Sequence, residues 1–281
     1  MDPDSPEPRP TIDAMRRSPI AISLALALTA AACGSTADAP ELTGNTLTPA
    51  EQAEVTENVE RNTGVRPAVS PGGVDRGIVE VDGTSIDYFT ITPEGFAEGD
   101  TAPVVLAMPP GSQSVSTTES VVNSVYRTEA LARGWVVVSP AAPGGQRFFD
   151  GSEDLIPGFL DWVEGWVTPE GGRPHLIGVS NGGLSAFRLA AQQTDAYESI
   201  IVFPGFPRSA DTDALPELTD IPIRMFVGEL DTSWVGPMDA TRQTLEDLGG
   251  DVELQILPNE NHIIQGLQDG RILFELLDGF R

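Results

Sequence analysis

The chain has 281 residues, of which 40% are hydrophobic, so it is long enough for one large folded domain with appendages. Its 42 acidic and 16 basic residues give a net charge of -26, which argues against nucleic acid as a partner and favours solubility. The sequence holds no cluster of histidines and cysteines at metal-ligand spacing and no lysine-containing phosphate loop. We therefore expect neither a metal nor another cofactor.

The N-terminal region has the pattern of a secretory signal. The basic pair Arg16-Arg17 precedes an apolar run over residues 20–32, which is too short to span a bilayer as a helix. Residues 1–14 are polar and acidic, unlike the first region of a signal. We therefore predict that the true start is Met15 and that residues 15–32 are a signal peptide.

The apolar run ends at Cys33, the only cysteine of the chain. The string Ala30-Ala31-Ala32-Cys33-Gly34 resembles a bacterial lipobox, whose cysteine is lipidated and becomes the mature N-terminus. Ala30 stands where Leu or Val is commoner, and the alternative is an ordinary signal peptide. We favour lipid attachment at Cys33, followed by a flexible tether over residues 33–73 with one short helix. The expected location is the bacterial cell surface or periplasm, with the lipid in the membrane.

Residues 74–281 alternate between strand-like and helix-like segments. Residues 77–81 and 85–92 form an expected hairpin, joined at Asp82-Gly83. The alternation predicts an α/β domain with a mostly parallel sheet of about eight strands, helices on both faces and chemistry at the carboxyl ends of the strands. The further expected strands are 103–108, 135–139, 176–179, 199–203, 223–227 and 252–257, and the expected helices are 119–132, 155–167, 184–191, 238–248 and 263–280, the last interrupted near Gly270.

Ser180 stands between an expected strand and an expected helix. The string Gly178-Val179-Ser180-Asn181-Gly182 has the G-x-S-x-G pattern of a nucleophile elbow, in which small residues let neighbouring backbone pass close by. In a chain this rich in glycine the pattern alone arises by chance on the order of 0.2 times. Its place between strand and helix is what makes Ser180 a candidate nucleophile.

Two further residues follow later strands and complete a candidate triad. Asp231 comes just after the strand 223–227, and His262 comes just after the strand 252–257. A serine hydroxyl needs a base to take its proton, and the base needs a carboxylate to orient it. The only other histidine, His175, lies at the elbow strand, so His262 is the candidate base. Glu229 is the alternative acid, but Asp231 lies beyond the end of the strand.

The order Ser180, Asp231, His262 is that of the α/β-hydrolases. Over residues 77–281 the chain resembles that superfamily, and is similar to secreted esterases of the polyhydroxybutyrate-depolymerase and feruloyl-esterase type and to phospholipase-like carboxylesterases. The resemblance implies an α/β-hydrolase fold and serine esterase activity. Lids of lipases are most often inserted where residues 204–221 lie here; this connection is short and contains three prolines, so we predict no large lid.

The resemblance also implies an oxyanion hole, and here the sequence departs from the family. One donor is expected from the backbone amide of Asn181. The other usually comes from a His-Gly-x loop, but this chain has Pro109-Pro110-Gly111-Ser112, and proline has no amide hydrogen. Gly111 is the first choice and Ser112 the second. Loss of one donor costs on the order of 10²–10³ in turnover, so this loop decides between an enzyme and an inactive relative. We favour a loop made rigid by the prolines, with Gly111 already aimed.

Trp234 and Phe206 are the candidate substrate-binding residues, because they lie close in sequence to the predicted site. We expect a monomer that hydrolyses short-acyl, aromatic or polymeric carboxylic esters. Two alternatives stay open: acyl transfer or peptide cleavage with the same triad, and a non-catalytic envelope-binding lipoprotein on a hydrolase fold.

Overall fold

The computed structural model describes residues 69–281. The predicted signal peptide, Cys33 and the tether up to residue 68 lie outside the described residues. Within the described range, every helix is too short or too polar to cross a membrane.

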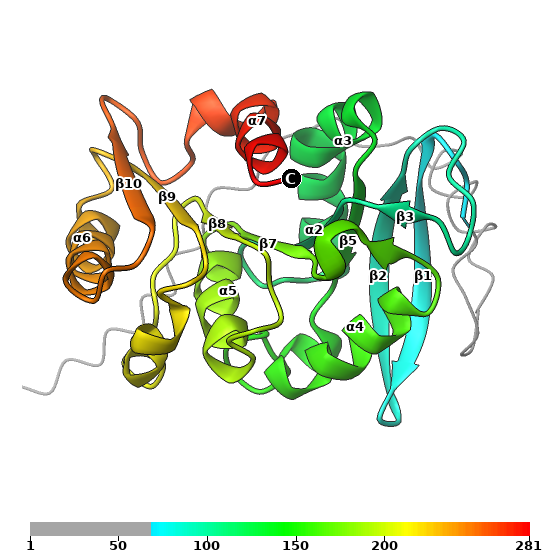
Figure 1. The fold of residues 1–281 in the computed structure, drawn as a ribbon, viewed down its shortest axis with the longest axis horizontal. Coiled ribbons are helices and arrows are strands. Elements are labelled where there is room, and N and C mark those ends of the chain that lie inside the picture. Colours follow the sequence, from blue (N-terminus) through cyan, green and yellow to red (C-terminus); the bar gives the residue numbers. More distant parts are fainter. Residues whose placement is uncertain (1–68) are drawn as a thin grey trace, which may run out of the picture. The chain divides into compact units, whose positions relative to one another are not determined.

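An eight-stranded sheet runs through the described chain in the order β1-β2-β5-β4-β7-β8-β9-β10 (Figure 1). The hairpin of β1 (Gly73–Val81) and β2 (Thr84–Thr92) is antiparallel, and β2 pairs antiparallel with β5 (Val136–Pro140). From β5 onward every neighbour is parallel, so the carboxyl ends of these strands share one edge. The remaining strands are β4 (Val104–Met108), β7 (His175–Gly178), β8 (Ile200–Val202), β9 (Ile223–Gly228) and β10 (Val252–Leu257). The predicted mostly parallel sheet is confirmed.

Helices cover both faces of the sheet, so the central strands are buried on both sides. One face carries α4 (Ile156–Glu164), α5 (Asn181–Gln192) and α6 (Thr232–Asp247). The other carries α2 (Val115–Val121), α3 (Arg127–Arg133) and α7 (Arg271–Gly279). A π-helical stretch, Val122–Tyr126, joins α2 to α3, and short 3-10 helices span Pro143–Gly145, Glu153–Leu155, Glu170–Gly172, Thr212–Leu218 and Gln265–Leu267.

Helix starts are where the structure departs most from the sequence prediction. The helix expected at 119–132 begins at Val115, because the Ser114 hydroxyl accepts the amide hydrogen of Thr117 and caps it. The helix expected at 238–248 begins at Thr232 and contains Pro237, which removes one backbone hydrogen bond early in the helix. A two-stranded sheet of β3 (Thr101–Ala102) and β6 (Thr168–Pro169) was not predicted, since two residues show no periodicity.

The helix expected at 263–280 is α-helical only after Gly270: α7 spans Arg271–Gly279, and before it lies only the 3-10 helix Gln265–Leu267, so the interruption predicted near Gly270 is present. Gly270 has a φ of +74°, and α7 begins at the next residue. A Cβ at this position would lie 2.1 Å from the carbonyl oxygen of Val125, so Gly270 lets the chain pass against the backbone of the π-helical stretch just before α7 begins.

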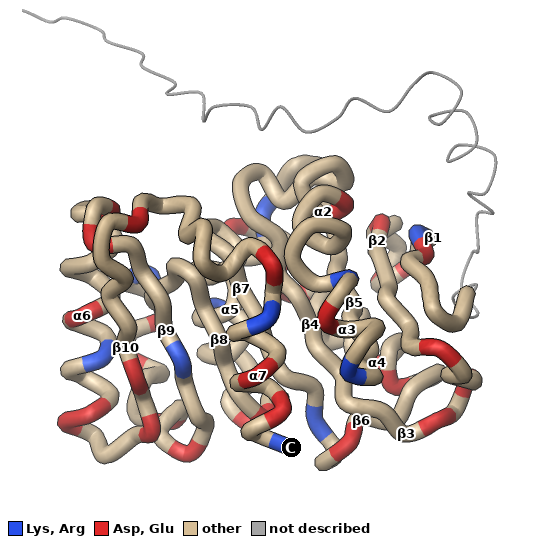
Figure 2. Tube along the Cα trace, turned by 90° about the horizontal axis from the view of Figure 1, so that it is seen from above, with Lys and Arg blue, Asp and Glu red and all other residues tan. Residues whose placement is uncertain are grey.

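Acidic residues are spread along the described chain, with arginines among them (Figure 2). Arg76 pairs with Asp87 at 2.8 Å across the hairpin, and Arg224 pairs with Asp251 at 2.9 Å beside β9. Such partly exposed surface pairs contribute about 0–1 kcal/mol each. The excess of carboxylates over arginines leaves the surface acidic.

Candidate active site

Ser180 lies at the sharp corner between β7 and α5. Its φ and ψ are 55° and -116°, a combination that residues with side chains rarely adopt and that costs on the order of 1–3 kcal/mol. The strand ends at Gly178 and the helix begins at Asn181, so the corner has no room for a relaxed turn. This is the strained backbone that the nucleophile-elbow pattern predicts, and the serine is half-buried there.

Neighbouring backbone fills the space that side chains on the elbow glycines would need. A Cβ on Gly182 would lie 2.0 Å from the carbonyl oxygen of Met108, and one on Gly178 would lie 2.3 Å from that of Gly182. A Cβ on Gly183 would lie 2.2 Å from the carbonyl oxygen of Pro204. The interpretation that these glycines permit close backbone approach is confirmed.

The structure brings the three candidate triad residues into one hydrogen-bonded row. The Oγ of Ser180 lies 2.7 Å from Nε2 of His262, and Nδ1 of His262 lies 2.6 Å from Oδ2 of Asp231. A carboxylate only accepts, so Nδ1 carries the proton of the neutral ring. Nε2 is then left as the acceptor of the Ser180 hydroxyl proton.

Burial differs between the two partners of the histidine. The side chain of Asp231 is only 8% exposed and also accepts a hydrogen bond from the Ser233 hydroxyl, whereas the His262 side chain is 40% exposed. The alternative acid, Glu229, accepts instead from the backbone amide of Asn259 at 3.1 Å. Among the described residues it is therefore Asp231 whose carboxylate meets His262.

A second carboxylate shapes the loop that carries His262. The two oxygens of Glu260 accept hydrogen bonds from the backbone amides of Gln265 and Gly266, at 2.9 and 3.1 Å. Its carbonyl oxygen accepts the amide of Leu230 at 2.9 Å, which ties the loop to the segment before Asp231. The sequence reasoning missed Glu260, since nothing in its local pattern marks it.

His175 lies far along β7 from the site, because it begins the strand that Ser180 follows. Its side chain is buried between Trp135 and Phe280, and Nδ1 lies 2.8 Å from Oγ of Ser199. Burial lowers the pKa of His175 to about 4, so the ring is neutral at pH 7. It has the environment of a structural histidine.

The candidate oxyanion residues lie side by side. Asn181 is the first residue of α5, where backbone amides have no partner within the helix. Its side-chain Nδ2 donates to the carbonyl oxygen of Gly111 at 2.7 Å. The carbonyl of Gly111 and the backbone amide of Ser112 belong to one trans peptide, in which the two groups point in opposite directions. The Ser112 amide therefore points away from the Asn181 side chain.

The loop that contains Gly111 is fixed by a residue that the sequence reasoning missed. Gln113 is fully buried, and its backbone amide donates to the carbonyl oxygen of Pro110 at 3.0 Å, which closes a tight turn. Gly111 enters that turn with a φ of +60°. A glutamine just after a turn looks like a solvent-facing residue in the sequence, and only the fold shows it to be buried.

Both candidate substrate-binding residues lie beside the histidine. The ring centroid of Trp234 is 5.0 Å from that of His262 and also 5.0 Å from that of Phe206. Trp234 and Phe206 are partly buried against the core, so each keeps part of its ring accessible. The three rings form a continuous aromatic surface that begins at the candidate base.

The connection between β8 and β9 is where a lid was considered. Its 3-10 helix, Thr212–Leu218, packs against α5 and α6, with Leu215 and Leu218 buried in the core. The apolar side chains of this segment are thus used in the core, in agreement with the prediction of no large lid.

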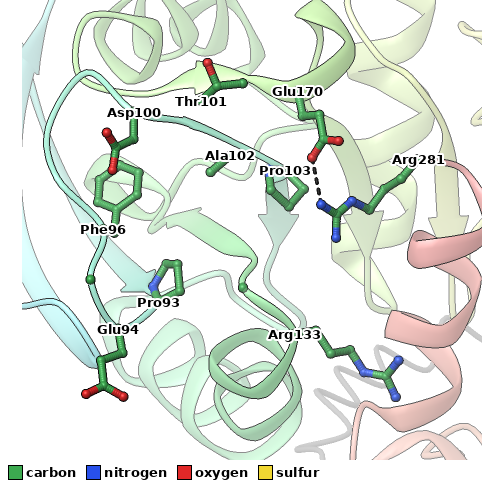
Figure 3. Close-up of a pocket in the computed structure, with 12 residues that line it drawn as sticks. Pro93, Glu94, Phe96, Asp100, Thr101, Ala102, Pro103, Arg133, Glu170 and Arg281 are labelled. Atoms are coloured by element: carbon green, nitrogen blue, oxygen red, sulfur yellow. Dashed lines mark hydrogen bonds and ion pairs between the residues drawn. The ribbon is translucent and has the colours of Figure 1, made fainter.

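A hollow of about 380 Å³ lies at the other edge of the sheet (Figure 3). Its lining includes Pro103 and Gly134, which come just before β4 and β5, whereas Ser180 follows the carboxyl end of a parallel strand. Arg281 and Glu170 in its lining pair with each other at 2.8 Å. None of the candidate site residues lines this hollow.

No family model and no curated protein matches the chain. Solved structures do match: a thermostable esterase with 15% identity and a TM-score of 0.57, over 73% of this chain and 62% of that one. A predicted CIB-like hydrolase from Thermoplasma acidophilum matches with 15% identity and a TM-score of 0.55, over 74% of this chain and 97% of that one. An S-formylglutathione hydrolase from Agrobacterium tumefaciens matches with 17% identity and a TM-score of 0.55, over 77% of this chain and 97% of that one. Together with the sheet order and the elbow, these likenesses establish that the chain has the α/β-hydrolase fold.

Proposed function

We propose that the protein is a serine hydrolase of carboxylic esters. The observation that carries the proposal is the row Ser180–His262–Asp231, with contacts of 2.7 and 2.6 Å, at the carboxyl edge of the parallel strands. The structural likeness to esterases and other hydrolases supports the same reaction class.

The residues divide the chemistry in the following way. His262 takes the hydroxyl proton of Ser180 as Oγ attacks the ester carbonyl carbon, and Asp231 stabilises the imidazolium that forms. The amides of Asn181 and Gly111 donate to the oxyanion. His262 then protonates the leaving alcohol, and an acyl-enzyme remains on Ser180. Water, deprotonated by His262, attacks the acyl carbon and releases the carboxylic acid and the free serine.

Short-acyl and aromatic esters are the proposed substrates. The rings of Trp234 and Phe206, inclined at 68° to each other, offer apolar surface next to His262, which suits a short acyl chain or an aromatic ring. The apolar side chains Leu215 and Leu218 of the β8–β9 connection are buried in the core. We therefore expect this connection to provide no large cover over a long acyl chain.

Labelling with a fluorophosphonate probe tests the proposal. An active serine nucleophile attacks the phosphorus and becomes covalently labelled, so the wild-type protein acquires the probe at Ser180 and the Ser180→Ala variant does not. If the folded protein is not labelled at Ser180, the proposal is contradicted, and the hypothesis of a non-catalytic envelope-binding protein remains. Matched ester and amide substrates, assayed with and without an alcohol acceptor, separate ester hydrolysis from peptide cleavage and acyl transfer.

We also propose that the enzyme is exported and held in the membrane by a lipid on Cys33. The support is the sequence alone: a basic pair, an apolar run and a lipobox-like end at the sole cysteine. Metabolic labelling with an alkyne fatty acid in a bacterial host tests it. The label is expected on wild type and absent from Cys33→Ala; an unmodified N-terminus upstream of Cys33 contradicts the proposal.

A further inference from the structure

The loop between β4 and α2 holds a buried glutamine in an uncommon backbone conformation. Gln113 is fully buried, and its φ of +57° lies in the left-handed region. For a residue with a side chain this region is sterically unfavourable, so surrounding contacts must hold Gln113 in place.

The side chain of Gln113 makes three hydrogen bonds to three different segments. Nε2 donates to the carbonyl oxygen of Pro109 at 3.1 Å and to Oγ of Ser185 at 2.8 Å. Oε1 accepts the backbone amide of Phe148 at 2.8 Å. The orientation of the amide group is settled, because a carbonyl oxygen can only accept and a backbone amide can only donate.

These bonds continue into a closed ring. Ser185 donates from Oγ to the carbonyl oxygen of Asn181 at 3.1 Å, and Asn181 donates from Nδ2 to the carbonyl oxygen of Gly111 at 2.7 Å. The backbone then leads from Gly111 back to Gln113. We name these four residues the Gln113 ring. It links the loop of Pro109 and Pro110 to the start of α5, directly after the candidate nucleophile Ser180.

Both candidate oxyanion donors belong to this ring. An oxyanion hole works because its donors are fixed before charge develops on the substrate oxygen. Pro109 and Pro110 restrict the backbone of the loop, but they cannot set its distance from α5. The hydrogen bonds of the Gln113 ring span the two segments, whose members Gln113 and Ser185 are 72 residues apart in sequence.

We propose that Gln113 is the positioning residue of the oxyanion hole: through the ring it holds the amide of Gly111 in register with that of Asn181. This inference rests on the proposed function. It also explains how a loop with two prolines in place of the usual His-Gly can serve catalysis, since its fixed geometry comes from a side chain outside that pair.

The test compares an ester with its thionoester, in which sulfur replaces the carbonyl oxygen. Sulfur is a weak hydrogen-bond acceptor, so a thionoester gains little from the oxyanion hole in any variant. In Gln113→Leu we expect kcat for the oxygen ester to fall about 100-fold, within the range for a lost oxyanion donor. We expect kcat for the thionoester and both KM values to stay within about threefold of wild type.

Two further variants guard against a folding defect. Ser185→Ala removes one bond of the ring and leaves the Pro109 contact, so a smaller loss, about tenfold and again confined to the oxygen ester, is expected. Thr118→Val is the control: Thr118 is fully buried and its hydroxyl donates to the carbonyl oxygen of Ser114 at 2.8 Å, outside the ring. It removes a buried hydrogen bond of similar kind and should leave the ratio of the two rates unchanged.

The outcomes separate this inference from the proposed function. If Gln113→Leu and Ser185→Ala lower kcat for the ester and the thionoester by the same factor, or lower neither value, the inference is overturned while the proposed esterase activity stands. A change of ratio in Thr118→Val also overturns it. If wild type neither hydrolyses the ester nor reacts with the fluorophosphonate, the proposed function itself fails and the inference falls with it.

Discussion

Asp231 and Glu229 lie two residues apart, yet only Asp231 meets the histidine. Its Oδ2 is 2.6 Å from Nδ1 of His262, while Oε2 of Glu229 is 3.1 Å from the backbone amide of Asn259. The difference follows from position: Glu229 comes directly after the last residue of β9 and reaches the adjoining turn beyond β10, whereas Asp231 is the residue before α6. The loop of His262 is thus braced by one carboxylate and its ring is oriented by the other.

Replacement of each of the two acids by its amide gives the first prediction. Asp231→Asn leaves the shape but offers an amide where Nδ1 needs an acceptor, so kcat/KM for a short ester should fall by about 10³–10⁴. Glu229→Gln keeps a carbonyl oxygen for the Asn259 amide and should change kcat/KM by less than about fivefold. Steady-state kinetics on both purified variants decide the ranking, and the reverse ranking would move the acid to Glu229.

Two glycines form a matched pair for the second prediction. A Cβ on Gly182 would lie 2.0 Å from a backbone oxygen that cannot move, so Gly182→Ala should destabilise the fold by about 3 kcal/mol or more and abolish activity. Gly236 lies inside α6 with nothing within 4 Å of an added Cβ, so Gly236→Ala should stabilise by about 0.5–1 kcal/mol. Denaturant unfolding measures both; equal effects would refute the close-approach argument.

The sheet and the meeting of the three candidate triad residues could be predicted because their signals are local. Ser180 and Asp231 come shortly after the buried apolar strands β7 and β9, and His262 comes shortly after the edge strand β10. Parallel pairing then brings their carboxyl ends to one edge. The Gly270 break was also local, since glycine permits the positive φ that ends one segment and begins another.

What the sequence could not show depends on contacts between distant segments. The burial of Gln113 follows from its bonds to Ser185 and Phe148, which no local pattern encodes. The early start of α6 was not predicted either: the helix begins at Thr232 and contains Pro237, a residue that usually disfavours a helix interior.

His175 gives a prediction on stability and pH. Its pKa is about 4 in the fold, mainly through burial, against 6.5 when exposed. A base whose pKa is lowered by folding stabilises the protein above its unfolded pKa, and this contribution is lost as pH falls from about 6.5 towards 4. The loss between pH 7.5 and pH 5 should be about 2 kcal/mol.

The variant His175→Asn isolates this contribution. Asparagine does not titrate, so the free energy of unfolding of the variant should fall less steeply between pH 7.5 and 5 than that of wild type. Urea unfolding at several pH values measures the difference, and the many carboxylates contribute equally to both proteins. Parallel curves for the two proteins would show that His175 is protonated without penalty in the fold.

Trp234 is predicted to select aromatic esters. Its ring lies 5.0 Å from that of His262, next to where an ester must sit, and a favourable aromatic pair contributes about 1 kcal/mol. In Trp234→Ala the ratio of kcat/KM for naphthyl over methyl butyrate should therefore drop roughly fivefold. The ratio cancels any general effect on His262. An unchanged ratio would place the alcohol group elsewhere.

Chain-length preference tests the open character of the site. The segment most often enlarged into a lid is a short 3-10 helix here, with Leu215 and Leu218 buried in the core rather than held ready to cover a ligand. Without a cover, each extra methylene of a long acyl chain gains little of the ~0.8 kcal/mol that burial provides. We expect butyrate to be preferred over palmitate by at least about tenfold in kcat/KM, a difference of ~1.4 kcal/mol in the barrier. The rate should show no jump when the substrate concentration passes the point at which micelles form. Faster turnover of palmitate, or such a jump, would point to a lipase that buries its acyl chain, and would remove the role given to the short wall of Trp234 and Phe206.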